Sequence, residues 1–281
     1  MPAIPVSKSP TQESIMTTAI ALTIAGSDSG GGAGIQADLK TFSALGVYGA
    51  SVITAVTAQN TRAVSAVAGV SPALIRAQIE AVFADLPPQA VKTGMLGDSA
   101  TICAVADGLA AVAALPPLVI DPVMVAKSGD KLLADTAIAT LRKRLIPLAM
   151  LLTPNLPEAG ELLGRPVVTR DEMPQAAADL LALGCRAVLL KGGHLADGHS
   201  DDLLLTADGT TWLTAARHPT QNTHGTGCTL SAAITAGLAK GLPLDAAVRE
   251  AKDYINAAIT AADRLHVGHG HGPLHHFYRW W

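Results

Sequence analysis

The sequence predicts an α/β protein with a mostly parallel central sheet and helices on both of its faces. Short apolar, β-branched runs alternate with longer helical patterns, and several of these runs are apolar throughout. Strands covered on both faces have such sequences, and a repeating strand–helix order gives a parallel sheet. The chain has 281 residues, of which 49% are hydrophobic and 15% charged. This composition provides a large core and argues against disorder.

The predicted strands are short runs, each of a length typical of a buried strand. They cover residues 20–25, 51–58, 90–93, 118–121, 150–153 and 187–190. Between residues 200 and 214 the pattern changes to two strand-like runs around Asp208-Gly209. Asp-Gly between such runs is a strong hairpin signal, so we expect an antiparallel pair near one edge of the sheet.

Helices are predicted between these strands from apolar residues at helical spacing. One stripe is formed by Leu74, Ile75, Ile79, Val82, Phe83 and Leu86, with Pro72 in the first turn. A second helix is expected from a cap at Asp98 or Ser99 to about residue 114. Two helices over residues 226–240 and 244–265 close the chain, separated by Gly241 and Pro243.

The body of the chain has no repeat and no domain linker, so we expect one domain over residues 17–281 after a loose tail at 1–16. The net charge of -3 and the lack of Lys/Arg runs give no indication of nucleic-acid binding. The apolar run 19–25 has the length of a strand and is too short for a membrane helix. Three scattered cysteines indicate a reducing compartment, and hence the cytoplasm.

The most informative stretch is the segment 222–228, which has the sequence NTHGTGC and precedes an apolar helix. Glycines permit tight backbone geometry, and the first N–H groups of a helix are unpaired and point outward. Such a helix start binds anions through its partial positive charge. The segment is therefore either a phosphate site or a glycine loop that merely begins a helix.

The sequence HGTGC resembles the anion-hole motif of the ribokinase-like kinases. A final cysteine is typical of their pyrimidine kinases and some pyridoxal kinases, whereas most sugar kinases have aspartate there. Other segments that resemble the family's motifs follow in the same order and spacing. They lie at residues 26–38, 58–61, 92–96, 121–124, 127–130, 153–158 and 191–194. The resemblance extends from about residue 18 to the C-terminus.

The resemblance implies a three-layer ribokinase-like fold and a kinase of thiamine synthesis. Its reaction would use ATP and Mg²⁺ to phosphorylate 4-amino-5-hydroxymethyl-2-methylpyrimidine and then the resulting monophosphate. The family is often dimeric, which implies a homodimer. The catalytic residues would be Gly225, Thr226, Gly227 and Cys228, with the backbone holding the phosphoryl group. The acceptor would contact Gln59, Gly26, Asp38 and Met95.

Gln59 lies at the end of an apolar strand, where open α/β sheets bind ligands. Its amide offers a donor beside an acceptor, which complements an aminopyrimidine edge. A plain polar strand end is the alternative. Cys228 occupies the place of a catalytic base, and a thiol at a helix start has a pKa below its free value of about 8.5. A thiolate is therefore expected there.

Asn155 and Glu158 resemble the N-x-x-E element that the family associates with Mg²⁺ and phosphate. Three-residue spacing at a helix start also fits a capping box, and both roles are compatible. Mg²⁺ usually keeps several waters, so few direct protein ligands are expected. Lys191 would pair with ATP phosphates, and Lys127 would belong to a loop that closes over them. Plain surface positions are the alternatives for both lysines.

Two other functions remain open at this point. A pyridoxal kinase of the same fold shares the HGTGC element, although Gln59 favours an aminopyrimidine. A non-catalytic pyrimidine-binding regulator is disfavoured by the joint presence of Lys191, Asn155, Glu158 and Cys228. The histidines at 266, 269, 271, 275 and 276 suggest a metal site, but their interleaved glycines give no fixed helix face.

Overall fold

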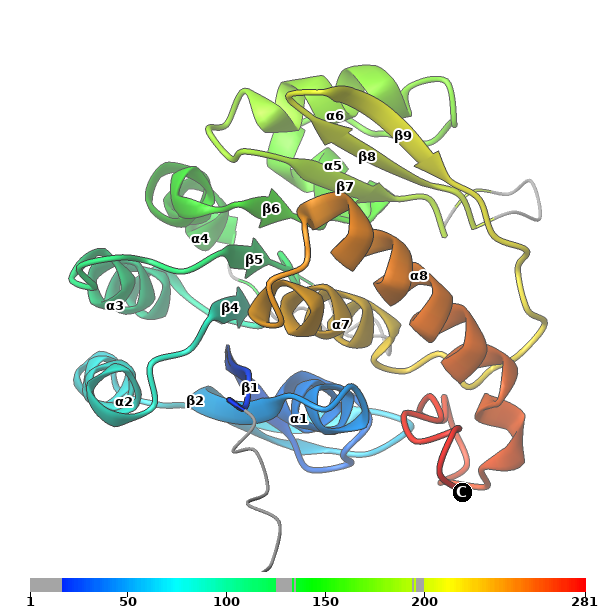
Figure 1. Ribbon diagram of the computed structural model, residues 1–281, viewed down its shortest axis with the longest axis horizontal. Helices are drawn as coiled ribbons and strands as arrows, with labels where there is room; N and C mark the ends of the chain where they lie inside the picture. Colours follow the sequence, from blue (N-terminus) through cyan, green and yellow to red (C-terminus); the bar gives the residue numbers. More distant parts are fainter. Residues whose placement is uncertain (1–16, 125–132, 134, 194, 196–199) are drawn as a thin grey trace, which may run out of the picture.

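The computed structural model describes residues 17–124, 133, 135–193, 195 and 200–281, and these residues form three layers (Figure 1). Within them, a nine-stranded sheet has the order β3-β2-β1-β4-β5-β6-β7-β8-β9. The strands from β2 to β7 in this order run parallel, whereas β3, β8 and β9 pair in antiparallel fashion. This architecture confirms the predicted sandwich with a mostly parallel sheet.

The strands occupy the predicted places, and β1 and β2 are longer than expected. Their bounds are β1 (Ile20–Asp28), β2 (Tyr48–Gln59), β3 (Val64–Gly69), β4 (Ala90–Thr93), β5 (Leu118–Ile120), β6 (Leu151–Leu152), β7 (Val188–Lys191), β8 (Asp202–Thr206) and β9 (Gly209–Leu213). The predicted hairpin around Asp208-Gly209 is confirmed as β8 and β9 at one edge of the sheet.

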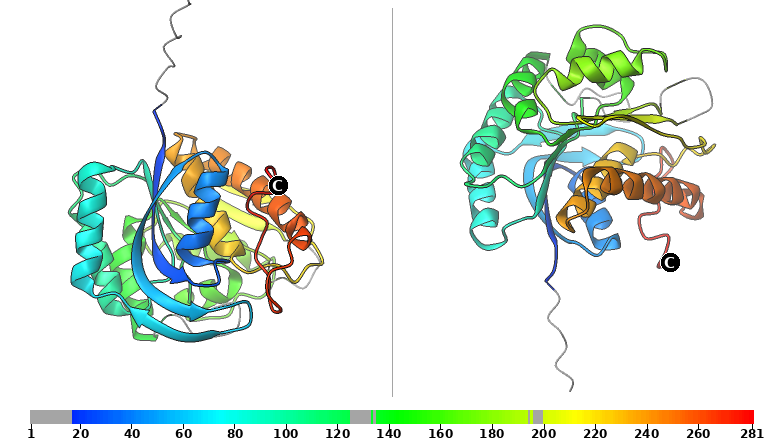
Figure 2. Two further views of the ribbon diagram at one scale, coloured as in Figure 1. Left: turned by 90° about the horizontal axis from the view of Figure 1, so that it is seen from below. Right: turned by 45° about the horizontal axis from the view of Figure 1, so that its top comes forward.

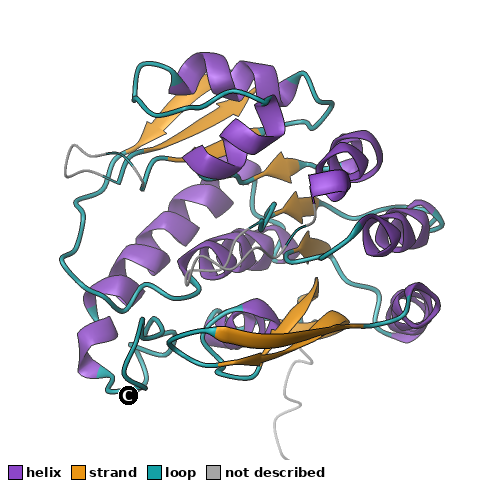
Figure 3. Ribbon diagram, turned by 180° about the vertical axis from the view of Figure 1, so that it is seen from behind, coloured by secondary structure: helices purple, strands orange, loops and turns teal. Residues whose placement is uncertain are grey.

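Helices cover both faces of the sheet (Figure 3). Their bounds are α1 (Gly34–Ala44), α2 (Pro72–Asp85), α3 (Ser99–Ala110), α4 (Asp135–Thr140), α5 (Leu156–Leu163), α6 (Met173–Leu181), α7 (Thr226–Ala239) and α8 (Leu244–Thr260). A π-helical turn (Leu141–Leu145) extends α4, and short 3₁₀ turns follow it and α8. Asp98 caps α3 by accepting a hydrogen bond from the Thr101 N–H, as predicted.

Two apolar cores lie on opposite faces of the sheet. Helices α2 to α6 contribute to one core, and α1, α7 and α8 contribute to the other. All residues of α7 from Thr229 to Ala239 are buried, because this helix lies between the sheet and α8 (Figure 1). The apolar, alanine-rich sequence of α7 therefore serves the core.

Four sequence expectations differ from the structure. Helix α3 ends at Ala110 rather than at about residue 114. Strand β3 was not predicted, because most of its residues are exposed and its sequence lacks a buried apolar pattern. Leu74 was expected on the buried stripe of α2, but 54% of it is exposed. The last helix ends at Thr260 rather than 265, and a 3₁₀ turn (Ala262–Arg264) follows it.

The topology creates a ligand site at the carboxyl ends of the parallel strands. Strand β1 has β2 on one side and β4 on the other, so the chain reverses its direction across the sheet there. Open α/β sheets bind ligands at such a switch point. The C-terminal segment after α8 returns past the loop between β2 and β3 (Figure 2), where the His271 N–H donates to the Thr61 carbonyl.

Candidate active site

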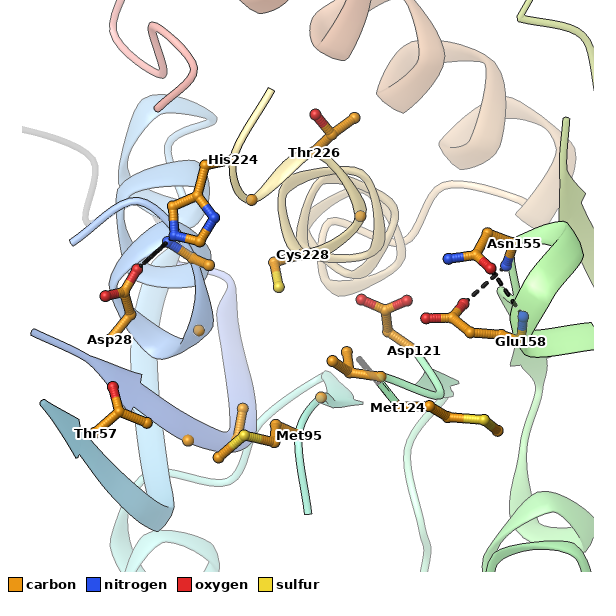
Figure 4. Close-up of a pocket in the computed structure, with 18 of the residues that line it drawn as sticks. Asp28, Thr57, Met95, Asp121, Met124, Asn155, Glu158, His224, Thr226 and Cys228 are labelled. Atoms are coloured by element: carbon orange, nitrogen blue, oxygen red, sulfur yellow. Dashed lines mark hydrogen bonds and ion pairs between the residues drawn. The ribbon is translucent and has the colours of Figure 1, made fainter. Parts of the chain in front are cut away.

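A cavity of about 510 Å³ opens at the carboxyl ends of the parallel strands. Its walls include Asp28 of β1, Gln59 of β2, Met95 after β4, Asp121 after β5 and Lys191 of β7. The start of α7 closes one side, so that residues from distant parts of the chain face one another (Figure 4). Most of the predicted site residues are therefore brought together.

Gly225 begins the first turn of α7 with a left-handed backbone, at φ 82°. A β-carbon at this position would lie 1.9 Å from the Gly32 carbonyl oxygen. Only glycine fits both the backbone conformation and the close approach of the first glycine loop. Gly225 therefore joins the two glycine-containing segments at the cavity.

The start of α7 presents unpaired backbone donors to the cavity. Within the described part of the chain, no hydrogen bond engages the N–H groups of Gly227 and Cys228. The Thr226 hydroxyl donates to the Thr223 carbonyl at 2.7 Å, which holds the turn in place. Unpaired N–H groups and the helix dipole make this turn suitable for binding an anion, as predicted.

Cys228 points from this turn into the cavity, between His224 and Asp121 (Figure 4). Burial raises the pKa of its thiol to about 12, while the charge of Lys92 opposes the shift and the charges of Asp38 and Asp121 add to it. The expectation that the helix start lowers this pKa is wrong, because desolvation outweighs the favourable charges. Cys228 is a neutral thiol at neutral pH.

Asp28 and His224 form a pair that the sequence analysis did not place in the site. The Asp28 carboxylate lies 2.9 Å from His224 Nε2 and accepts the N–H groups of Gly30, Gly32 and Ala33. Burial opposes ionisation, but the hydrogen bonds from His224 and from the Ala33 and Gly30 N–H groups hold the pKa of Asp28 below its usual value. The charged carboxylate thus fixes His224 at the cavity wall.

Gln59 lies in the cavity wall, at the end of β2 as predicted. Its Oε1 accepts a hydrogen bond from the Thr57 hydroxyl at 3.1 Å, and its Nε2 lies 3.4 Å from His224 Nε2. Since Asp28 is ionised, the His224 Nε2 proton points to Asp28, and this nitrogen is no acceptor for Gln59. The Gln59 amide N–H groups therefore remain available to a ligand.

Gly26 and Met95 lie together in the wall of the same part of the cavity. A β-carbon on Gly26 would lie 2.4 Å from Met95 Cε, so a larger residue would displace the end of the Met95 side chain from its place across the strand. The Met95 carbonyl accepts the Thr54 hydroxyl at 2.7 Å, which anchors the segment after β4. The two residues give this region an apolar surface suited to an aromatic ring.

Asp38 is not in the cavity wall, so the expectation that it contacts the acceptor directly is wrong. Its side chain is fully buried in α1, where it pairs with Lys92 at 2.7 Å and accepts the Thr23 hydroxyl at 2.6 Å. A buried carboxylate requires partners of this kind. Asp38 ties α1 to β1 and β4 beneath the site.

Lys191 lies between two carboxylates at the floor of the cavity. Its Nζ is 3.0 Å from Asp121 Oδ1 and 3.9 Å from Glu158 Oε2. Burial by itself would lower the pKa of Lys191, because it disfavours the charged ammonium. The two carboxylates have the larger effect and raise this pKa. Burial raises the pKa of Glu158 to about 7, against the effect of Lys191. Lys191 is thus a paired cation whose side chain is 12% exposed, and the surface-lysine alternative does not hold.

Asn155 and Glu158 form the capping box that begins α5. The Glu158 N–H donates to Asn155 Oδ1 at 2.9 Å, and the Asn155 N–H donates to Glu158 Oε2 at 2.8 Å. The residues fit Mg²⁺, because Glu158 keeps Oε1 free of this box and Asp121 adds a second carboxylate beside Lys191. Asn155 Oδ1 already accepts the Glu158 N–H, so the role of Asn155 is to hold Glu158 in position.

A second cavity, of about 580 Å³, adjoins the first. Both cavities are lined by Asn155, Lys191, Thr223, Thr226 and Gly227. The second extends between α8 and the end of the β8–β9 hairpin, where Leu230, Ile255 and Ile259 provide apolar surface. The anion-binding turn and Lys191 thus lie at the boundary of two cavities.

Other expectations concern residues away from these walls. The loop was predicted over residues 124–131, and Lys127 with residues 125–131 lies outside the described residues. In the described ranges, no group of three His, Cys, Asp or Glu side chains could hold a metal ion by itself. Asp28, His224 and Asp121 were missed as site residues, although Asp28 ends β1 within the first glycine loop, His224 precedes Gly225 and Asp121 precedes Pro122. None of the described helices is both long and apolar enough to cross a membrane.

Comparison with known proteins agrees with this geometry. The model of the family described as "Phosphomethylpyrimidine kinase" matches residues 28–275. The hydroxymethylpyrimidine/phosphomethylpyrimidine kinase of Rhizobium meliloti is 59% identical over 94% of this chain and 99% of its own length. The chain also aligns with about half of the thiamine biosynthesis bifunctional protein ThiED of Geobacter sulfurreducens, at 52% identity over 91% of this chain.

A solved structure shares the architecture. The pyridoxal kinase of Bacillus subtilis, in an ADP complex, superposes with a TM-score of 0.85 and 39% identity over 92% of this chain and 98% of its own. The fold and site therefore define a small-molecule kinase of the ribokinase-like class. Within that class, the chain belongs to the phosphomethylpyrimidine kinase family.

Proposed function

We propose that this enzyme transfers the γ-phosphoryl group of ATP to 4-amino-5-hydroxymethyl-2-methylpyrimidine and then to the monophosphate, in thiamine synthesis. The observation that carries the proposal is that the α7 start and Lys191 border both cavities. A donor in one cavity and an acceptor in the other would meet at the anion-binding turn. The relatives named for both phosphorylations support this assignment.

ATP occupies the second cavity in this proposal, with its base against Leu230, Ile255 and Ile259. Its phosphates then reach the boundary between the cavities, and the pyrimidine lies in the first cavity between Gln59 and Met95. The acceptor oxygen forms a bond to the γ-phosphorus as the bond from phosphorus to the bridging oxygen breaks. ADP leaves, and the proton of the alcohol acceptor is released to solvent. Catalysis of such transfer rests on positioning and charge stabilisation.

The chain's own residues supply both requirements. The N–H groups of Gly227 and Cys228 hold oxygens of the transferring group, and Lys191 offsets their negative charge. Mg²⁺, when bound, neutralises phosphate charge, and Glu158 and Asp121 would hold it with waters completing its shell. The Asn155 N–H keeps the Glu158 carboxylate oriented, because it donates to Glu158 Oε2 in the capping box.

Cys228 acts in this proposal as a neutral thiol beside the reacting hydroxyl. With a pKa of about 12 it is a poor proton acceptor at neutral pH. The loose transition state of phosphoryl transfer loses the hydroxyl proton late, so a strong base contributes little. A phosphate acceptor, which is already ionised, needs no base at all. The thiol then shapes the pocket for both acceptors.

The Cys228→Ser variant is expected to lower kcat for the alcohol and for the monophosphate by a similar factor, of less than about tenfold. The serine hydroxyl keeps the size and the neutral charge of the thiol. Base catalysis would instead add a loss of roughly 100-fold or more on the alcohol alone. Measuring kcat with both acceptors from pH 6 to 9 tests this, and a selective loss on the alcohol would restore Cys228 as the base.

The Gln59→Leu variant is expected to raise KM for the pyrimidine by roughly 5- to 150-fold, since a lost buried hydrogen-bonding partner costs about 1–3 kcal/mol. Leucine keeps the volume but removes the donor and the acceptor. KM for ATP should stay unchanged, because Gln59 lies outside the second cavity. Steady-state kinetics with each substrate varied in turn gives both values. An unchanged pyrimidine KM would remove Gln59 from the acceptor site.

A pyridoxal kinase activity is the second candidate, because a pyridoxal kinase shares the fold. Pyridoxal offers a phenolic oxygen and an aldehyde, which do not complement the amide of Gln59 as an aminopyrimidine does. A comparative kinase assay with hydroxymethylpyrimidine, its monophosphate and pyridoxal decides between the two. A higher kcat/KM for pyridoxal would overturn the proposed substrate.

We also propose a cytoplasmic homodimer. The free cysteines Cys103, Cys185 and Cys228 suit a reducing compartment.

Strand β3 is an edge strand, and Val56 and Val67 on the β2–β3 pair are each about half exposed, at 51% and 54%. A second copy covering this face would shield both the edge and the apolar side chains. Sedimentation analysis of the full chain measures the mass of the assembly.

A further inference from the structure

The glycines of the segment 268–272 lie where no side chain fits. A β-carbon on Gly270 would lie 2.1 Å from the Thr61 carbonyl oxygen, and one on Gly272 would lie 2.0 Å from Asn222 Oδ1. Gly268 combines a φ of 73° with a similar approach to the Thr61 side chain. Close contact with two loops therefore explains the glycine spacing of this segment, here called the C-terminal strap.

Thr61 is the contact at one end of the strap. Its hydroxyl oxygen accepts the N–H groups of His269 at 3.3 Å and Gly270 at 3.1 Å. Its carbonyl oxygen accepts the His271 N–H at 2.9 Å. One residue thus binds three successive N–H groups of the strap, and it lies two positions after Gln59.

The other end of the strap holds the segment that leads into α7. The His224 N–H donates to the Gly272 carbonyl at 3.0 Å, and His271 Nδ1 lies 3.3 Å from the Gln221 carbonyl. His224 directly precedes Gly225, the first residue of the anion-binding turn. The strap therefore contacts the loop beyond Gln59 at one end and the α7 start at the other.

A different contact, from the first glycine loop, holds the backbone of Gln59. The Gln59 N–H donates to the Ser29 hydroxyl oxygen at 2.8 Å, and this hydroxyl donates to the Gln59 carbonyl at 2.9 Å. The first glycine loop thus holds Gln59 through Ser29, and the strap holds the loop that follows through Thr61. Figure 2 shows the C-terminal segment beside the loop between β2 and β3. In the cavity wall, Gln59 Nε2 and His224 Nε2 lie 3.4 Å apart.

We propose that the C-terminal strap sets the separation between Gln59 and the anion-binding turn, with Thr61 as the positioning residue. The inference rests on the proposed function, because it takes Gln59 as the residue that binds the acceptor. A fixed separation aligns the acceptor oxygen with the phosphoryl group, and small misplacements in such sites reduce rates strongly. Thr61 is absent from the walls of the second cavity, whereas His271 at the other end of the strap lines it, so loss of the Thr61 hydroxyl contacts is expected to affect the acceptor more than ATP.

The test compares Thr61→Val with Thr61→Ser in the full-length enzyme. Valine keeps the shape but removes the oxygen that accepts two N–H groups, so we expect pyrimidine KM to rise on the order of tenfold. KM for ATP should stay within about twofold. Serine keeps the oxygen and should restore the wild-type KM. The rescue separates positioning by this hydroxyl from a general loss of stability, which thermal unfolding measures alongside.

Gly270→Ala provides a second variant, since its β-carbon has to displace the strap from the Thr61 carbonyl. Gly69→Ala is the matched control, because its β-carbon meets no atom within 4 Å. We expect Gly270→Ala to raise pyrimidine KM as Thr61→Val does, and Gly69→Ala to leave it unchanged. An unchanged pyrimidine KM in both strap variants, or an equal rise in the KM of ATP, would overturn the inference.

The Gln59→Leu variant distinguishes this failure from failure of the proposed function. If Gln59→Leu raises pyrimidine KM while Thr61→Val and Gly270→Ala do not, the strap inference is wrong and the acceptor assignment stands. If Gln59→Leu leaves pyrimidine KM unchanged, the acceptor assignment is wrong and the strap inference falls with it.

Discussion

The Gly225→Ala variant is expected to lower kcat for both acceptors by on the order of 100-fold or more, the scale of losing one oxyanion-hole donor. The added β-carbon would lie 1.9 Å from the Gly32 carbonyl oxygen, so the first turn of α7 has to move. This movement displaces the N–H groups of Gly227 and Cys228 from the transferring phosphoryl group. Steady-state kcat with the alcohol and with the monophosphate measures the effect.

Gly241→Ala is the matched control at the other end of the same helix. Gly241 also has a left-handed backbone, at φ 84°, but a β-carbon there meets no atom within 4 Å. Both variants bear the backbone strain of about 1–2 kcal/mol that alanine has in this conformation. If Gly241→Ala lowers kcat as much as Gly225→Ala does, the loss comes from strain and the anion-binding role of the turn is refuted.

The fold was predictable because its signals are local. Buried strands such as β5 and β6 are apolar on both faces, so their sequences identify them without knowledge of their neighbours. The sequence pattern does not identify strand β3, because this strand is defined by its pairing with β2 and most of its residues are exposed. The end of α8 was also missed, since the apolar pattern continues into the 3₁₀ turn that follows it.

The candidate site was predictable where a motif marks it and unpredictable where contacts are distant in sequence. Strand ends, glycine segments and the resemblance to the ribokinase-like kinases together predicted Gln59, Lys191 and Gly225 as site residues, and all three line the cavity. Asp38 was misassigned because its partner Lys92 lies 54 residues away, and a helix acid looks exposed without it. The contact between Asp28 and His224 was not predicted for the same reason, because these residues are 196 positions apart in the sequence.

The burial of the Cys228 thiol and the Glu158 carboxyl away from water was also not predictable from the sequence. A helix start and a nearby cation both favour a thiolate at Cys228, and these are the effects that local sequence suggests. Burial acts in the opposite direction and is larger, which raises the thiol pKa to about 12. The same balance raises the pKa of Glu158 to about 7 even though Lys191 lies 3.9 Å away. Burial thus decides the charge state of both groups.

The Lys191→Met variant is expected to lower kcat by on the order of 100-fold, and by the same factor for the two acceptors. Methionine keeps an unbranched side chain and removes the charge that offsets the ATP phosphates. The loss should be equal for the two acceptors, because both phosphorylations use ATP as the donor and take place at the same boundary between the cavities. Rates at saturating ATP and Mg²⁺ measure it. A loss confined to one acceptor would move Lys191 to the acceptor side of the site.

The same variant has a second signature, in the pH dependence of stability, that does not depend on catalysis. Lys191 counteracts the burial that raises the pKa of Glu158, so its removal moves this pKa further above 7. A carboxyl whose pKa is raised in the folded state stabilises the fold at low pH, and this contribution is lost as pH rises through the folded-state pKa. The fall in Tm relative to wild type should therefore be larger at pH 8 than at pH 6. In the double variant Lys191→Met/Glu158→Gln, which lacks this ionisation, the excess at pH 8 should shrink. An equal fall in Tm at both pH values would show that Glu158 is not ionised against Lys191 in the folded enzyme.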